Sequence, residues 1–259
     1  MIEKVRILFL TANPWTTSRI LVDEEAREIF EKLQEGPYRD YFELHIHVAL
    51  RPGDLQRLLM IFEPHIVHVS AHGSKTHKLI FAGGPGRGKQ IDREGLANLF
   101  SLYRHHVRLV FLNACFMRSQ ARAISRTIDY AIGTGKGIGD KGGVAFAAAF
   151  YRALGFGRSM RQAFCSAKAE IGLTRMRRTD GIELFVRDGV DKDCQFPVSE
   201  RRPSLNNFGN SLGPCLDEFI GKPQRLLLDT RGTLRKPRAP QKKRAVAQPS
   251  VRRRKPKVK

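Results

Sequence analysis

The feature that most constrains the fold is the almost uniformly apolar stretch VRLVFLNAC at residues 107–115. A run in which neighbouring positions, and not only alternating ones, are apolar is typical of a strand that is buried on both faces. Such strands occur in parallel sheets covered by helices on each side. The stretch therefore predicts an α/β domain with this strand near the centre of its sheet.

Strand-like and helix-like segments alternate on both sides of this run. Further strands are predicted at 5–11, 41–50, 66–70, 130–134 and 182–188, with a hairpin at 78–84 and 86–91. Helical spacing of apolar residues predicts helices at 21–36, 52–64, 92–103, 119–128, 141–154 and 160–173. Asp54, Asp92 and Ser159 are predicted to cap three of these helices. The alternation predicts a mostly parallel sheet flanked by helices.

The periodic pattern ends near residue 195, which divides the chain into three parts. Residues 1–195 are expected to form the α/β domain, and residues 196–221 have the composition of a linker. Residues 222–259 are rich in Pro, Arg and Lys and too poor in apolar residues to build a core. This basic tail is predicted to be disordered.

The charge of the chain is concentrated towards that tail. The formal net charge is +21, and residues 203–259 carry 15 Lys and Arg against 3 Asp and Glu. A polyanion such as nucleic acid, or an acidic protein, is the partner that such a segment would attract. The tail has no aromatic side chain for base stacking, and a soluble linker without a defined partner remains the alternative.

Four cysteines, with no CxxC pair among them, argue against a disulfide framework and against a structural zinc site. The apolar run near the amino terminus is only about six residues long, and no run approaches the roughly 20 residues that cross a bilayer. We expect a reduced, cytoplasmic protein without a membrane partner, metal or cofactor. The sequence does not indicate an oligomeric state.

Two of the predicted strands end in chemically reactive residues. IVHVSAHG ends at His72 and Gly73, and RLVFLNAC ends at Cys115. Sites in open parallel sheets lie at the carboxyl ends of the strands, so neighbouring strands would bring these side chains together. An imidazole can activate a thiol as a nucleophile. The amides of Gly73 and Cys115 could then form an oxyanion hole, whereas a buried thiol that only packs is the alternative for Cys115.

Three motifs in order, HVSAHGS, VRLVFLNACF and GIGDKGGVAFAAAFYRALGFGRSMRQAF, resemble the CHAT-type, caspase-like cysteine peptidases. The resemblance covers about residues 3 to 190. It implies a caspase-like α/β sandwich with adjacent strands and a His72–Cys115 dyad. It also implies that Asp140 lines the substrate pocket and favours a basic P1 side chain. A cap for a helix beginning at Lys141 is the alternative role of Asp140.

Two glycine-rich stretches match nucleotide-binding patterns only in part. GGPGRGKQ at 83–90 has Gln where a phosphate-binding loop needs Ser or Thr, and in GIGDKG at 137–142 the carboxylate of Asp140 would repel a pyrophosphate. Neither stretch is expected to bind a nucleotide.

The remaining histidines and cysteines are interpreted as structural. His68 is expected at the edge of the core, and Cys165 is expected to pack in the apolar stripe of its helix. Metal ligation is not expected at four further histidines, which are His45, His47, His105 and His106.

The paired reactive residues predict a cysteine endopeptidase that cleaves a protein or peptide substrate, and the resemblance implies cleavage after basic P1 residues in a regulated caspase-like system of bacterial type. The alternative is a catalytically silent, caspase-like interaction module that binds nucleic acid or an acidic partner through its basic tail.

Overall fold

The computed structural model describes residues 4–12, 22–74, 76–83, 88–135, 139–173, 181–191 and 193. The predicted linker and basic tail, residues 196–259, lie outside the described part of the chain. Within the described part, no helix is both long enough and apolar enough to cross a membrane.

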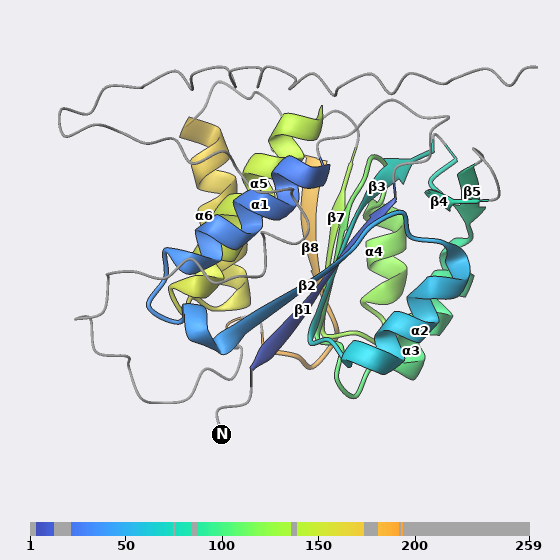
Figure 1. Ribbon diagram of the computed structural model, residues 1–259, viewed down its shortest axis with the longest axis horizontal. Helices are drawn as coiled ribbons and strands as arrows, with labels where there is room; N and C mark the ends of the chain where they lie inside the picture. The colour runs from blue at the N-terminus through green and yellow to red at the C-terminus, as the bar shows by residue number, and fades with distance from the viewer. Residues whose placement is uncertain are drawn as a thin grey trace, which may run out of the picture. The chain divides into compact units, whose positions relative to one another are not determined.

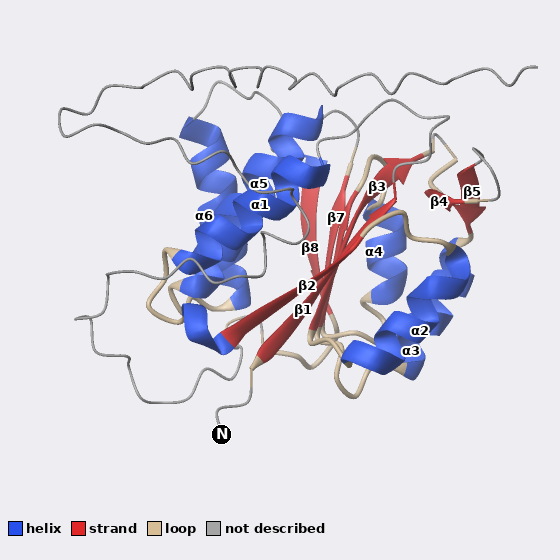
Figure 2. Ribbon diagram, viewed as in Figure 1, coloured by secondary structure: helices blue, strands red, loops and turns tan. Residues whose placement is uncertain are grey.

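A single sheet forms the middle layer of the domain (Figures 1 and 2). Its strands are β1 (Val5–Ala12), β2 (Phe42–His47), β3 (Ile66–Gly73), β4 (Leu79–Ala82), β5 (Gly88–Ile91), β6 (Leu109–Asn113), β7 (Tyr130–Thr134) and β8 (Ile182–Val186). The order is β2-β1-β3-β6-β7-β8, and β8 pairs with β7 in the antiparallel direction. The other pairings along this path are parallel, which confirms the mostly parallel sheet.

Helices cover both faces of the sheet, as the sequence predicts. They are α1 (Val22–Gln34), α2 (Pro52–Phe62), α3 (Arg93–Leu102), α4 (Arg118–Ile124), α5 (Gly139–Gly155) and α6 (Met160–Leu173), with a short 3-10 turn at Arg39–Tyr41. In Figure 2, α1, α5 and α6 lie on one side of the sheet, whereas α2, α3 and α4 lie on the other. The hairpin β4–β5 extends from the tip of β3, where His72 pairs with Ile80.

The alternation of side chains along β3 divides the apolar core into two layers. Ile66 belongs to the core beneath α1, α5 and α6, whereas Val67 and Val69 belong to the core beneath α2, α3 and α4. Phe111 and Val110 divide in the same way on β6. Both faces of these strands are buried, which explains why their sequences are apolar at neighbouring positions.

Two of the three predicted helix caps are confirmed. Asp92 accepts hydrogen bonds from backbone amides at the start of α3, and the Ser159 hydroxyl accepts one from the Gln162 amide at 3.3 Å. The prediction for Asp54 is wrong in position, because Arg51 is the N-cap residue of α2. Asp54 lies in the first turn, and its carboxylate accepts a hydrogen bond from the Arg51 amide at 3.1 Å, since Pro52 allows the helix to begin earlier.

Two other side chains lie where the sequence did not predict them. His68 is fully buried on a central strand, between the rings of Phe9 and Phe111 at centroid distances of 4.9 and 4.3 Å, and is not at the core edge. Cys165 is exposed, because the buried stripe of α6 passes through other positions. Those positions are Met160, Ala163, Phe164, Ala167 and Ile171.

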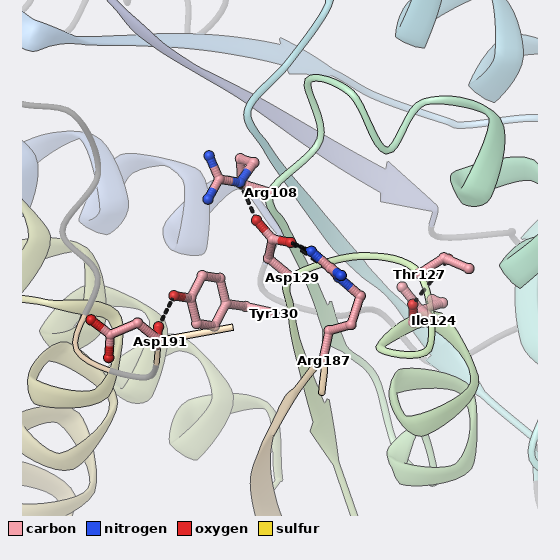
Figure 3. A network of polar contacts seen from close by, with 7 residues as sticks. All are labelled: Arg108, Ile124, Thr127, Asp129, Tyr130, Arg187 and Asp191. Carbon is pink, nitrogen blue, oxygen red and sulfur yellow. Dashed lines mark hydrogen bonds and ion pairs between the residues drawn. The ribbon is translucent and has the colours of Figure 1, made fainter. Parts of the chain in front are cut away.

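An ion-pair cluster joins three strands at the amino-terminal edge of the parallel strands (Figure 3). Asp129 accepts hydrogen bonds from the guanidinium groups of Arg108, just before β6, and Arg187, just after β8. The Arg187 distance is 2.7 Å, and the Arg187 amide also donates to the Asp129 carbonyl at 2.9 Å. On β7, the Tyr130 hydroxyl donates to the carbonyl of Asp191. These contacts fix β6, β7 and β8 at the edge opposite the candidate site.

Candidate active site

The tips of β3 and β6 lie side by side, as the positions of the reactive residues predict. The two strands are parallel neighbours, and Ser70 is paired with Asn113 at the end of their shared ladder. His72 and Cys115 each follow this pair by two residues. Both side chains are half-buried and line one cavity at the carboxyl-terminal edge of the sheet.

The cavity has a volume of about 60 Å³ and is bounded by side chains from both strands and from the first turns of α1 and α5. This volume is well below the roughly 300 Å³ at which small-molecule sites begin. The cavity therefore suits part of a single side chain better than an organic cofactor. Its lining residues are Glu25, Ser70, Ala71, His72, Gly73, Asn113, Ala114, Cys115, Thr134, Gly139, Asp140 and Val144.

Gly73 lies against the backbone that carries the thiol. A Cβ at this position would overlap the carbonyl oxygen of Cys115 and would meet Cε of Met117 at 3.0 Å. The sequence alone indicates that this glycine lets a substrate carbonyl approach. The contact adds a second reason for glycine, because the two loops can approach each other only when residue 73 has no side chain.

The loop after Cys115 is held in a strained conformation. Phe116 has a φ of 65°, a value that is uncommon for a bulky residue. Nδ1 of His77, whose own φ is 59°, lies 3.2 Å from the Phe116 carbonyl oxygen. Gln120 donates to the His77 carbonyl, and the Met117 amide donates to the Thr134 carbonyl at 2.7 Å. Strain of this kind collects at functional sites, where neighbouring contacts must hold it.

A buried carboxylate lies beneath the cavity. Glu25 on α1 is 2% exposed, and its Oε2 accepts a hydrogen bond from the Ser70 hydroxyl at 2.6 Å. Its Oε1 accepts one from the Asn113 amide, also at 2.6 Å. Nε2 of His68 is 3.0 Å from the same Oε1, although the ring N–H does not point at it closely enough for a good hydrogen bond.

Tyr151 on α5 extends this polar network into the core. Its hydroxyl lies 3.2 Å from Nδ1 of His68, and its ring is fully buried. Burial, and secondarily the negative charge of Glu25, raise the pKa of Tyr151 well above its ordinary value. The phenol therefore stays protonated and can donate to His68. The network connects α1, β3, β6 and α5 beneath the cavity.

Asp140 is an exposed residue at the rim of the same cavity. The alternative in which it caps a helix beginning at Lys141 is wrong, because α5 begins at Gly139 and Asp140 lies inside its first turn. An acid there is favoured by the helix dipole. One turn later, a Cβ on Gly143 would meet Oδ1 of Asn113 at 2.6 Å, so this glycine lets α5 approach the tip of β6.

All four residues that the sequence singled out, His72, Gly73, Cys115 and Asp140, line this one cavity. Sequence reasoning missed Glu25, because acids at the start of a helix are sufficiently explained by the dipole. It also missed three polar lining residues, Ser70, Asn113 and Thr134. For Ser70 and Asn113, a polar side chain at the end of an otherwise apolar strand was the available clue.

Among the residues that the structure describes, Cys115 and Cys165 form no disulfide bond. No group of three or more His, Cys, Asp or Glu side chains in this part of the chain has an arrangement that could hold a metal ion.

Comparison with known proteins gives two curated relatives. A Roc-COR-CHAT protease from an unknown prokaryotic organism is 27% identical over 156 residues, which cover 58% of this chain and 15% of the relative. A probable protease from Gillisia limnaea is 25% identical over 130 residues, which cover 49% of this chain and 23% of the relative. The similarity to a CHAT protease confirms the resemblance that the motifs predict, over less than a quarter of the length of each relative.

The fold was also compared with solved structures. A secreted C11 cysteine protease from Bacteroides thetaiotaomicron, in complex with an irreversible peptide inhibitor, aligns with a TM-score of 0.47 and 13% sequence identity. The alignment covers 70% of this chain and 65% of the protease. No family model matches the sequence.

Proposed function

We propose that this chain is a caspase-like cysteine endopeptidase of the CHAT type, with Cys115 as the nucleophile and His72 as its acid–base partner. The observation that carries the proposal is that both residues line one cavity at the ends of adjacent parallel strands. The protease names of the two curated relatives support the same reaction class.

The proposed reaction has two stages. The Cys115 sulfur attacks the scissile carbonyl carbon, the C–N bond breaks, and the thiol proton reaches the leaving amine through His72. Water then attacks the thioester, which releases the carboxylic acid and restores the thiol. The amides of Gly73 and Cys115 are proposed to stabilise the negative oxygen of each tetrahedral intermediate. The strained Phe116 backbone would hold the second of these amides in place.

We assign Asp140 to recognition of the P1 side chain. Its carboxylate lies at the rim of the cavity, and Glu25 places a second acid at the floor. Both charges favour a cationic side chain over an anionic one. Arg or Lys at P1 is therefore the proposed preference.

Hydrolysis of a peptide library varied at P1 tests these assignments. The wild-type protein should cleave after Arg or Lys, whereas Cys115→Ala and His72→Ala should reduce the rate about 10²-fold or more. Asp140→Asn should reduce kcat/KM for basic P1 residues while cleavage after neutral ones persists. A preference for Asp at P1 would contradict the role of Asp140, and cleavage that survives Cys115→Ala would contradict the peptidase mechanism.

A second candidate function rests on the charge of the carboxyl-terminal region. Residues 203–259 carry 15 basic and 3 acidic side chains, which favours contact with nucleic acid or an acidic partner. In this alternative the domain is catalytically silent and serves as an interaction module. It predicts that Cys115→Ala leaves binding to nucleic acid or an acidic partner unchanged, whereas removal of the basic tail abolishes this binding.

A further inference from the structure

We propose that Glu25 is a positioning residue that clamps together the strand tips bearing His72 and Cys115, an inference that rests on the proposed function. The clamp consists of Glu25, Ser70 and Asn113. The Glu25 carboxylate accepts one hydrogen bond from Ser70 on β3 through Oε2 and one from Asn113 on β6 through Oε1. Both distances are 2.6 Å.

The position of the clamp within the sheet explains why it would matter for the site. Ser70 and Asn113 are direct register partners and form the final pair of the β3–β6 ladder. Each residue precedes a reactive residue by two positions, so a displacement of either strand end moves His72 relative to Cys115. The carboxylate bridges the strands at the last paired position of the ladder. Beyond this pair, on the side of His72 and Cys115, the ladder no longer fixes the separation of the two strands.

The burial of Glu25 favours a positioning role over a purely stabilising one. Removing a carboxylate from water is costly, and packed apolar residues often stabilise a core at least as well as a buried ion pair. Here the carboxylate has three polar neighbours, and the third, His68, is itself supported by the Tyr151 hydroxyl. The two hydrogen bonds from Ser70 and Asn113 direct the two carboxylate oxygens at the two strands, and the His68 ring lies beside Oε1.

The clamp also connects to the proposed specificity residue. The Asn113 side chain lies between Glu25 and the backbone of α5 at Gly143, and Asp140 is on the preceding turn of that helix. The Asn113 side chain of the clamp therefore lies close to the helix whose first turn carries Asp140.

Alkylation of Cys115 by iodoacetamide tests the clamp without requiring a peptide substrate. Peptide mapping by mass spectrometry gives the rate at Cys115 relative to that at exposed Cys165 in the same molecule. Glu25→Leu should lower this ratio about tenfold, because the apolar side chain accepts no hydrogen bond from either strand and the dyad is then misaligned. Glu24→Leu, at an exposed neighbouring position on α1, is the matched control and should leave the ratio unchanged.

An exchange of partners separates positioning from general damage to the fold. Asn113→Asp alone places two carboxylates together and should also lower the ratio. Combined with Glu25→Gln, the hydrogen bond forms again in the reverse direction, and the ratio should return to within about threefold of wild type. If Glu25→Leu does not fold by circular dichroism, Ser70→Ala removes one hydrogen bond only and should lower the ratio as well.

The outcomes for the clamp and for the peptidase are distinguishable. An unchanged ratio in folded Glu25→Leu, or a Glu25→Gln/Asn113→Asp variant no better than Asn113→Asp alone, overturns the clamp even if the wild type cleaves peptides. A protein that cleaves no peptide, but whose ratio falls and recovers in this way, overturns the peptidase proposal and leaves the clamp standing.

Discussion

Gly73 makes the closest backbone approach at the candidate site, and its replacement tests how tightly the two strand tips must meet. Gly73→Ala should lower the free energy of unfolding by about 1–3 kcal/mol, because the new methyl group overlaps the Cys115 carbonyl. It should also slow alkylation of Cys115, since the loop must move to accommodate the methyl group. Urea unfolding and peptide mapping measure the two effects.

Gly95→Ala is the matched control for this change. A Cβ at Gly95 would meet nothing within 4 Å, and the residue lies in α3. Its replacement should leave the stability within about 1 kcal/mol of wild type, on the stabilising side. Equal behaviour of the two variants would contradict the close contact at Gly73.

Among individual residues, the sequence identified those whose side chains have recognisable chemistry. It missed those whose role depends on contacts with residues distant in the chain. The shared location of His72, Cys115 and Asp140 at one cavity could be predicted, because the expected strand ends and helix start, together with recognisable motifs, placed them at the same edge of the sheet. Glu25 could not, because it contacts residues 45 and 88 positions away and belongs to an acidic helix start that has its own explanation. The contact of Gly73 with the Cys115 carbonyl likewise depends on the tertiary structure.

Among the elements, helix α2 offers a test by pH. Burial alone would raise the pKa of Asp54, but the Arg51 amide, the Arg57 guanidinium and the nearby His47 outweigh it, so the pKa lies below its ordinary value. Asp54 therefore stabilises the fold above the pKa of the unfolded state, about 3.9, and this contribution disappears as the pH falls through the lower folded-state pKa.

Asp54→Ala should accordingly reduce the free energy of unfolding by about 1 kcal/mol at pH 7, and the difference should shrink as the pH falls below about 3.9. Denaturant titrations between pH 2.5 and 7 measure it. Asp40→Ala removes an exposed carboxylate and should change stability little at any pH. A pH-independent effect of Asp54→Ala would show that the carboxylate charge is not what stabilises α2.

The cluster at the opposite edge of the sheet should affect stability alone. Asp129→Asn removes the charged acceptor shared by Arg108 and Arg187, and we expect the free energy of unfolding to fall by about 1–3 kcal/mol. The ratio of Cys115 to Cys165 alkylation should stay at the wild-type value, because these residues lie at the amino-terminal edge of the strands. A fall in that ratio with the fold intact would contradict the separation of the two edges.

The positions of the elements followed from periodicity, whereas their ends did not. The apolar run at 107–115 predicted a central strand, yet β6 occupies only Leu109–Asn113, because the residues after Asn113 turn to form the cavity wall. The start of α5 and the cap of α2 were misplaced by two or three residues for a related reason. Local hydrogen bonds decide where a helix begins, and apolar spacing does not report them.

For the whole molecule, the charge of the tail predicts a separable binding property. Deleting residues 222–259, which contain all 15 basic side chains of the region after residue 202, should strongly reduce affinity for double-stranded DNA. Binding by the full chain should weaken steeply with added salt. Replacing Arg252, Arg253, Arg254 and Lys255 by glutamine should reduce the salt slope by about one unit for each phosphate that these side chains neutralise. Unchanged affinity after the deletion would contradict this partner class.

The central claim is that Cys115 is a nucleophile assisted by His72, and covalent labelling tests it most directly. A peptide acyloxymethyl ketone with Arg or Lys at P1 is incubated with the full-length protein, and the adduct is located by peptide mapping. We predict one adduct, on Cys115, absent in Cys115→Ala and slowed about 10²-fold or more in His72→Ala. An adduct that persists in Cys115→Ala, or no adduct with any P1 residue, would contradict the account.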